Sequence, residues 1–145
     1  FGFRELPHAS SAATTMSWSE LHPPAFGDLL IRLRDEWNVP VIYVTENGLP
    51  MTEATEVTHG DDIDDTPRTA YLAAHLREAG RAIQAGAPLR GYFVWCLVDT
   101  FEWNYGYRPR FGIVRVERPS LRRVPKRSAI WYRATIASAP IESGS

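Results

Sequence analysis

The segment GYFVWCLVD, residues 91–99, sets the strongest limit on the fold, because it is almost wholly apolar and does not alternate apolar with polar residues. Strands of this kind are covered on both faces, as they are in parallel sheets. A second run of β-branched and aromatic residues, Val41 to Thr45, also predicts a buried strand, which the turn-forming pair Asn47-Gly48 ends. A tight turn cannot join parallel strands, so the chain between these runs must contain a crossover.

The predicted crossover is a helix over residues 66–85. Its apolar residues recur at helical spacing and are Leu72, Leu76, Ala79 and Ile83. Asp65 or Thr66 can cap its first turn, and Gly86 follows its last turn. Residues 49–64, between the first strand and this helix, are predicted to form a polar loop.

Two further helices are predicted, one before and one after these elements. The first begins at Pro23 and Pro24 and ends before Asn38. Its apolar face comprises Phe26, Leu29, Leu30, Leu33 and Trp37. The last helix covers about 125–138 and is expected to bury Ile130, Trp131 and Ile136. Residues 113–117 are predicted to form a short strand, residues 1–17 a loop, and residues 139–145 a tail.

This order of elements predicts an α/β fold built from βα units. Two parallel strands are too few to close a sheet, so either another chain completes it or the chain is part of a (β/α)8 barrel. In such barrels the functional groups lie at the carboxyl ends of the strands. Glu46 ends the first predicted strand and Asp99 to Trp103 follow the second, so both are expected on one rim.

Composition excludes several classes of protein. The 145 residues are the length of one ordinary domain, and a net charge of -1 argues against nucleic-acid or membrane partners. No apolar run approaches the roughly 20 residues of a membrane span. Cys96 is the single cysteine, so no internal disulfide is possible, which is weakly consistent with a reducing cytoplasm. We expect Cys96 to be a small buried apolar residue.

No metal site or cofactor is expected. The acidic run Asp61, Asp62, Asp64 and Asp65 lacks the glycine and terminal glutamate of an EF-hand loop. It is predicted to be a solvated loop with acids that cap the following helix. The four histidines are spaced too irregularly for metal ligands and are expected to be surface or core residues: His8, His22, His59 and His75.

The segments YVTENG and GYFVWCLVDTFEWNYGYRPRFGIVRVE carry a resemblance to glycoside hydrolase family 1, the β-glucosidase family. Further similar motifs occur in the family's order: TTMSW, PPAFGDLL, DDTPRTAYLAAHL and RRVPKRSAIWY. The resemblance covers only the last third or so of the family's catalytic domain. It implies that residues 1–145 are the C-terminal part of one (β/α)8 barrel, namely its last two βα units and the preceding helix. An N-terminal segment outside this chain would complete the barrel.

Carried over residue by residue, the resemblance implies that Glu46 is the catalytic nucleophile. It implies that Trp95 is the aromatic floor of the sugar site, and that Glu102 accepts hydrogen bonds from sugar hydroxyls 4 and 6. The remaining implied sugar contacts are Trp103, Phe111 and Trp18. Two positions depart from the family pattern: Cys96 stands in place of the usual Ser, and Thr100 in place of the usual Asn.

The implied activity is hydrolysis of β-glucosides or β-galactosides with retention of configuration. A carboxylate at Glu102 would repel a 6-phosphate, which favours unphosphorylated substrates. The family's acid/base glutamate lies in a T-x-N-E-P segment that this chain lacks, so the N-terminal segment would have to supply it. Other readings stay open: a non-catalytic carbohydrate-binding or vestigial module, a plain strand-end acid at Glu46, and core packing at Trp95 and Phe111.

Overall fold

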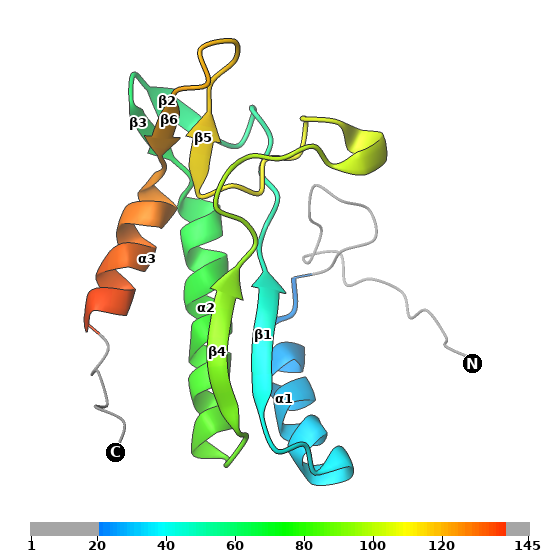
Figure 1. Cartoon of the computed structure of the whole chain (residues 1–145). Helices are drawn as coiled ribbons and strands as arrows, with labels where there is room; N and C mark the ends of the chain where they lie inside the picture. The colour runs from blue at the N-terminus through cyan, green and yellow to red at the C-terminus, as the bar shows by residue number, and fades with distance from the viewer. Residues whose placement is uncertain (1–20, 139–145) are drawn as a thin grey trace. The chain divides into compact units, whose positions relative to one another are not determined.

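The computed structural model describes residues 21–138, so Trp18 and the predicted terminal loop and tail lie outside the described residues. The helices are α1 (Pro23–Trp37), α2 (Thr66–Gln84), α3 (Arg127–Ser138) and the short 3-10 helix η1 (Trp103–Tyr105). The strands are β1 (Ile42–Asn47), β2 (Val57–His59), β3 (Asp62–Asp64), β4 (Leu89–Val94), β5 (Val114–Val116) and β6 (Arg123–Pro125). They pair as β1–β4, β2–β3 and β5–β6 (Figure 1).

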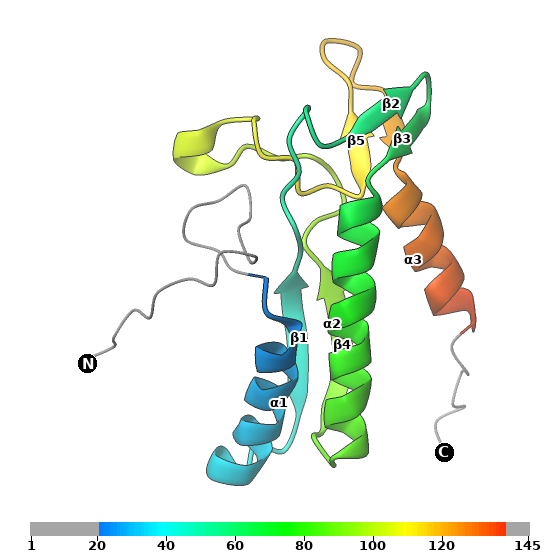
Figure 2. The same ribbon diagram turned by 180° about the vertical axis from the view of Figure 1, so that it is seen from behind.

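The described residues form two compact units, one of residues 21–42 and 74–90 and the other of residues 43–73 and 91–138. In the first unit, α1 lies beside the C-terminal part of α2 (Figure 2). The ring of Phe26 lies 5.4 Å from that of His75, and Arg81 donates to Asp28 over 2.7 Å. The predicted helix is confirmed: prolines occupy its first turn, and Asn38 ends it in the left-handed conformation.

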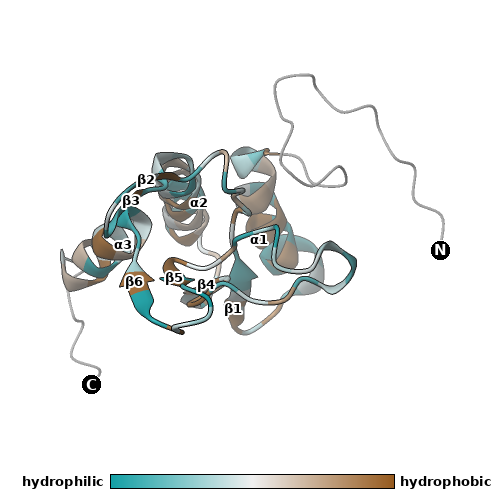
Figure 3. Ribbon diagram, turned by 90° about the horizontal axis from the view of Figure 1, so that it is seen from above, coloured by the Kyte–Doolittle hydropathy of each residue, from teal (hydrophilic) through white to brown (hydrophobic). Residues whose placement is uncertain are grey.

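The apolar face predicted for α1 is only partly buried. Leu30 is buried, but Leu29 and Trp37 are exposed, and Ile83 on α2 is exposed as well. No element within residues 21–138 covers these exposed side chains. Both helices nevertheless carry hydrophobic and hydrophilic residues together, as Figure 3 shows. None of the helices described is long and apolar enough to cross a bilayer.

The second unit contains most of the sheet of β1 and β4, whose strands run in the same direction (Figure 1). The prediction that both strands are covered on each face is wrong within the described residues. Tyr43 is 56% exposed and Phe93 is 58% exposed. Their rings flank Gly91, where an added Cβ would lie 2.6 Å from the ring of Tyr43. One face of the sheet is therefore apolar and open, because no described element packs against it.

The strand boundaries differ from the prediction at the carboxyl ends. β1 continues to Asn47, so Glu46 lies inside the strand, whereas β4 stops at Val94. Beyond β4 the chain turns to pair with the segment that precedes β5. Cys96 accepts a bond from the Ile113 N–H over 3.0 Å, and Leu97 accepts one from the Val114 N–H over 2.9 Å. Cys96 is buried, as predicted.

Two short hairpins were not predicted in full. β2 pairs antiparallel with β3, inside the segment predicted to be a polar loop. β5, which confirms the predicted strand, pairs antiparallel with the unpredicted β6. Strands of three residues carry too little alternation to be recognised in a sequence. β6 also uses Pro125, so α3 begins two residues later than expected.

The helices of the second unit confirm the predicted positions and correct parts of the predicted burial. Ile130 and Ile136 of α3 are exposed, contrary to the prediction, because no described element lies over them. Asp65 is fully buried rather than solvated, and its carboxylate accepts bonds from Arg68 and from the N–H of Ser128. Asp64 instead accepts from the Thr66 N–H over 2.9 Å and so satisfies a donor of the first turn of α2.

Candidate active site

Glu46 lies near the carboxyl end of β1, and its side chain is exposed. Among residues 21–138 no hydrogen-bond donor or cation contacts its carboxylate. An exposed carboxylate at the end of a rigid strand avoids the cost of burying a charge, and the strand still fixes its position. The chain can therefore hold an acid directly after five apolar or β-branched residues, because Glu46 lies at an exposed end of the strand.

The residue after Glu46 is held from several directions. The Tyr92 hydroxyl donates to Asn47 Oδ1 over 2.6 Å, and the Trp95 N–H donates to the Asn47 carbonyl over 2.9 Å. The Tyr71 side chain hydrogen-bonds Asn47 as well. Gly48 has to be glycine, because a Cβ there would lie 1.8 Å from the Trp95 carbonyl oxygen. Asn47 and Gly48 therefore hold the end of β1 against Trp95, the first residue after β4.

The tyrosines around Asn47 stay protonated and available as donors. Burial, together with the neighbouring hydroxyls of Tyr71 and Tyr132, raises the pKa of Tyr92 far above its ordinary value. Burial likewise raises the pKa of Tyr71, although its bond to Asn47 works in the opposite direction. Tyr132 on α3 donates to the Tyr92 carbonyl over 3.3 Å. Helices α2 and α3 thus both support the strand end that carries Glu46.

The aromatic segment after β4 begins beside this strand end. Trp95, which is bonded to the Asn47 carbonyl, is 36% exposed. Further along, the Glu102 N–H donates to the Gly106 carbonyl and the Tyr105 N–H donates to the Glu102 carbonyl, each over 2.7 Å. Glu46 and Trp95 are therefore brought together, and Glu102 is placed on a turn of defined backbone geometry.

The other predicted sugar contacts differ widely in exposure. Trp103 is 86% exposed and has a φ of 41°, in the left-handed region that a tryptophan rarely adopts. A conformation of this kind costs on the order of 1 kcal/mol and is common in ligand-binding segments. Phe111 is only 8% exposed, so in the described structure it is a core residue whose carbonyl accepts from the Cys96 N–H.

Asp99 serves as a structural hydrogen-bond acceptor. Its Oδ1 accepts from the Gly112 N–H and from Lys126 Nζ, each over 3.0 Å. Gly112 has to lack a side chain, because a Cβ there would lie 2.3 Å from the Asp99 nitrogen. This contact joins the aromatic segment to the start of β5.

A buried cluster centred on Glu56 escaped the sequence analysis. Glu56 Oε1 accepts from Lys126 Nζ over 2.6 Å, and Arg68, Arg110 and Arg115 each lie within 3.4 Å of its carboxylate. Burial raises the pKa of Glu56, but the charges of Lys126, Arg68 and Arg115 together outweigh burial and hold it below its ordinary value. The one signal in the sequence was Lys126 itself, the only lysine in a chain otherwise rich in arginine.

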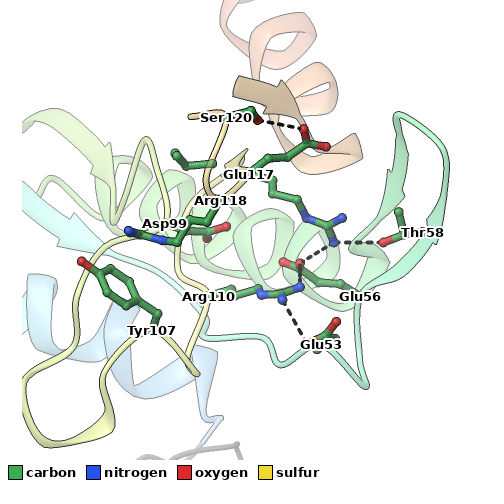
Figure 4. Close-up of a pocket in the computed structure, with 11 residues that line it drawn as sticks. Glu53, Glu56, Thr58, Asp99, Tyr107, Arg110, Glu117, Arg118 and Ser120 are labelled. Atoms are coloured by element: carbon green, nitrogen blue, oxygen red, sulfur yellow. Dashed lines mark hydrogen bonds and ion pairs between the residues drawn. The ribbon is translucent and has the colours of Figure 1, made fainter. Parts of the chain in front are cut away.

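A hollow of about 720 Å³ borders this cluster (Figure 4). Several of its charged side chains are already paired: Arg110 and Arg115 contact Glu56, and Glu117 contacts Arg122 outside the hollow. Of the predicted sugar-binding residues that the structure describes, none lines it. Among the described residues no group of three or more His, Cys, Asp or Glu side chains could hold a metal ion. The strand ends near Glu46 and Trp95 are therefore the better candidate active site.

Known proteins resemble this chain over most of its length. The sequence profile of "Glycosyl hydrolase family 1" matches residues 3–140. Beta-glucosidase A of Thermotoga maritima is 40% identical over 139 residues, which are 96% of this chain and 29% of that protein. The 6-phospho-beta-galactosidase of Lacticaseibacillus rhamnosus is 41% identical over 132 residues, 89% of this chain and 28% of that protein.

Solved structures of family 1 enzymes are similar to this chain as well. The family 1 β-glucosidase of Thermotoga maritima superimposes with a TM-score of 0.80 at 40% identity, covering 94% of this chain and 29% of that structure. The chain therefore spans about three-tenths of the length of the relatives it matches, and its fold is part of a (β/α)8 barrel without closure. It belongs to glycosyl hydrolase family 1.

Proposed function

We propose that this chain is the nucleophile-bearing part of a retaining β-glycosidase, with Glu46 as the nucleophile. The observation that carries the proposal is the position of Glu46. It lies exposed at the carboxyl end of β1, one residue before the Asn47 carbonyl that binds the Trp95 N–H. Family 1 membership and the carboxyl-end location of active groups in (β/α)8 barrels both support this assignment.

The chemistry needs two carboxyl groups about 5–5.5 Å apart. Glu46 attacks the anomeric carbon, the bond from that carbon to the leaving oxygen breaks, and a second carboxylic acid gives its proton to that oxygen. In the second step water attacks the same carbon, the second group takes the proton of the water, and Glu46 is released. Glu102 is a poor candidate for the second group, because Thr100 already donates to its carboxylate in a segment suited to sugar binding.

The acid/base group and further sugar contacts would come from the part of the barrel that this chain does not span. Within the chain, we assign sugar contacts to Trp95, Glu102 and Trp103, with weaker support for the buried Phe111. Trp18 is a further candidate outside the described residues. An indole beside a carboxylate suits a pyranose, which has an apolar C–H face and a rim of hydroxyl groups.

We propose an unphosphorylated β-glucoside or β-galactoside as the substrate. The carboxylate of Glu102 would repel a phosphate at position 6 of the sugar. Overall identity does not decide this point, since a relative named 6-phospho-beta-galactosidase is as similar as the β-glucosidases. The alternative function is a non-catalytic carbohydrate-binding module, favoured by the exposed Trp103 and by the absence of a T-x-N-E-P segment from this sequence.

A chimaera tests the proposal: residues 3–140 replace the region that they match in Thermotoga maritima β-glucosidase A. We expect it to hydrolyse an aryl β-glucoside, and Glu46→Gln to lower kcat by roughly 10⁴-fold or more, because an amide cannot attack the anomeric carbon. Glu53→Gln is the matched control, since its exposed carboxylate contacts only Arg110 within residues 21–138. Normal turnover by Glu46→Gln would refute the assignment. Loss of turnover in both variants would point to misfolding.

A further inference from the structure

Thr100 is the one side chain that contacts the carboxylate of Glu102 in the described structure. Its hydroxyl donates to Glu102 Oε1 over 2.7 Å. A charged acceptor makes such a bond roughly twice as strong as one between neutral groups. The bond occupies one of the four lone-pair sites on the two carboxylate oxygens, and the others remain for hydroxyl donors.

Two backbone hydrogen bonds restrain the main chain at Glu102, so the orientation of its carboxylate depends on its side-chain torsions. Its N–H is bonded to the Gly106 carbonyl and its own carbonyl accepts from the Tyr105 N–H. Gly106 has a φ of 63°, which favours glycine, and closes this turn. An unrestrained glutamate side chain has several accessible rotamers, and ordering it costs conformational entropy. The Thr100 hydroxyl is therefore the contact that selects one orientation of the Glu102 carboxylate.

Cys96 lies beside Thr100. The Cys96 Sγ lies 3.9 Å from Thr100 Oγ1 and donates its own hydrogen to the Val98 carbonyl over 2.9 Å. Burial raises the pKa of the Cys96 thiol, so it stays protonated and keeps this bond. Cys96 and Thr100, which both depart from the family pattern, are therefore neighbours, and Thr100 in turn contacts Glu102.

We infer that Thr100 is a positioning residue for sugar recognition: it orients Glu102 toward the hydroxymethyl end of the sugar. The inference rests on the proposed function, because it takes Glu102 as the acceptor of hydroxyls 4 and 6. A site built to pair these hydroxyls discriminates against sugars that lack one of them. Thr100 therefore contributes to the preference for a glucoside over a xyloside, which has no hydroxymethyl group.

Kinetics of the chimaera test this role. We expect Thr100→Val to lower kcat/KM for an aryl β-glucoside by about tenfold, and for the aryl β-xyloside by no more than about threefold. Thr100→Ser keeps the hydroxyl and is expected to restore both values. Thr135→Val is the matched control, because the Thr135 hydroxyl only bonds the Trp131 carbonyl of its own helix. Equal losses on both substrates, or no loss on either, would overturn the inference.

Binding gives a test that needs no turnover. Deoxynojirimycin, the ligand in one solved complex of the Thermotoga maritima enzyme, carries the hydroxymethyl group, whereas its xylo-configured analogue does not. Calorimetry should show about tenfold weaker binding of deoxynojirimycin to Thr100→Val and nearly unchanged binding of the analogue. If the unsubstituted chimaera binds both ligands but hydrolyses nothing, the proposed function fails while this comparison still decides the role of Thr100. Equal effects on the two ligands would overturn that role.

Discussion

Asn47 shows how a single residue can fix the position of its neighbour, here the proposed nucleophile Glu46. Its side-chain oxygen accepts from Tyr92 over 2.6 Å, and its carbonyl accepts from the Trp95 N–H over 2.9 Å. Glu46 precedes it in the same strand, so any rotation of the strand end would move the Glu46 carboxylate. A nucleophile displaced by about 1 Å can lose roughly a hundredfold in rate. The Asn47 contacts are therefore part of the reactivity that we propose for Glu46.

Removing the Tyr92 hydroxyl tests this account. Tyr92→Phe takes a partly buried donor from Asn47 Oδ1, so we expect a loss of about 1 kcal/mol in the free energy of unfolding. We also expect kcat to fall by roughly tenfold with a smaller change in KM, because the strand end loses one of its restraints. Urea unfolding and aryl β-glucoside kinetics of the chimaera measure both. Tyr132→Phe, which loses only a 3.3 Å bond to a carbonyl, is the control. Equal effects of the two variants would contradict the account.

Glu56 predicts how stability responds to acid. Its pKa in the folded state lies below its ordinary value of 4.5, because Lys126, Arg68 and Arg115 outweigh the opposite effect of burial. The unfolded state therefore binds this proton more tightly. The stabilisation is present above about pH 4.5 and is lost as the pH falls through the lower folded pKa.

Urea unfolding of the chimaera at several pH values between about 3 and 7 checks this prediction. The free energy of unfolding should fall toward acid pH, and less steeply in Glu56→Gln. At pH 7 this substitution should cost about 3–5 kcal/mol, because it leaves the buried Lys126 beside Arg68 without its main partner. Glu53→Gln, which changes an exposed acid of the same segment, should keep the original pH dependence. An unchanged pH dependence in Glu56→Gln would contradict the prediction.

At the scale of secondary structure, the open face of the β1–β4 sheet is the feature with the clearest consequence. Tyr43 and Phe93 are both more than half exposed on it. A two-stranded sheet with free edges and an apolar face is a template for association. In a closed (β/α)8 barrel, side chains on such a face would pack against those of the other strands.

We therefore expect the isolated chain to self-associate. Sedimentation velocity should show species larger than a monomer whose share grows with concentration. Phe93→Lys should reduce this association, because a charge on the open face opposes strand pairing. Ile136→Lys, on an exposed position of α3, should change it less. A monomeric, two-state unfolding curve for the unsubstituted chain would contradict this expectation.

The helices and the two main strands could be predicted because their patterns are long. Helices α1 and α2 carry apolar residues at helical spacing, and prolines, Asn38 or Gly86 mark their ends. The hairpins could not be predicted, since Val57–His59 and Arg123–Pro125 have only three residues each. Burial was overestimated on the open sheet face, because sequence patterns report the complete fold whereas the described residues contain only part of it.

At the scale of the whole molecule, the chain is part of a (β/α)8 barrel. Its sequence motifs identify the family, and this identification does not depend on the shape of any cavity. Glu46, Trp95 and Glu102 could be proposed from the resemblance, but the restraints on them were invisible in sequence. The Tyr92–Asn47 and Thr100–Glu102 bonds join residues whose pairing depends on side-chain orientation. The Glu56 cluster was also missed, because Glu56 and Lys126 lie 70 positions apart and no sequence pattern links them.

We propose that Glu46 attacks the sugar, while a group in the complementary part of the barrel gives the proton to the leaving oxygen. Treatment of the chimaera with 2-deoxy-2-fluoroglucosyl fluoride, followed by peptide mass spectrometry, tests this division most directly. We predict one added fluoroglucosyl group, located on Glu46, because the fluoride leaves without a protonated acid. An adduct on any other carboxylate would contradict the account, and so would no adduct at all from a chimaera that still hydrolyses aryl β-glucosides.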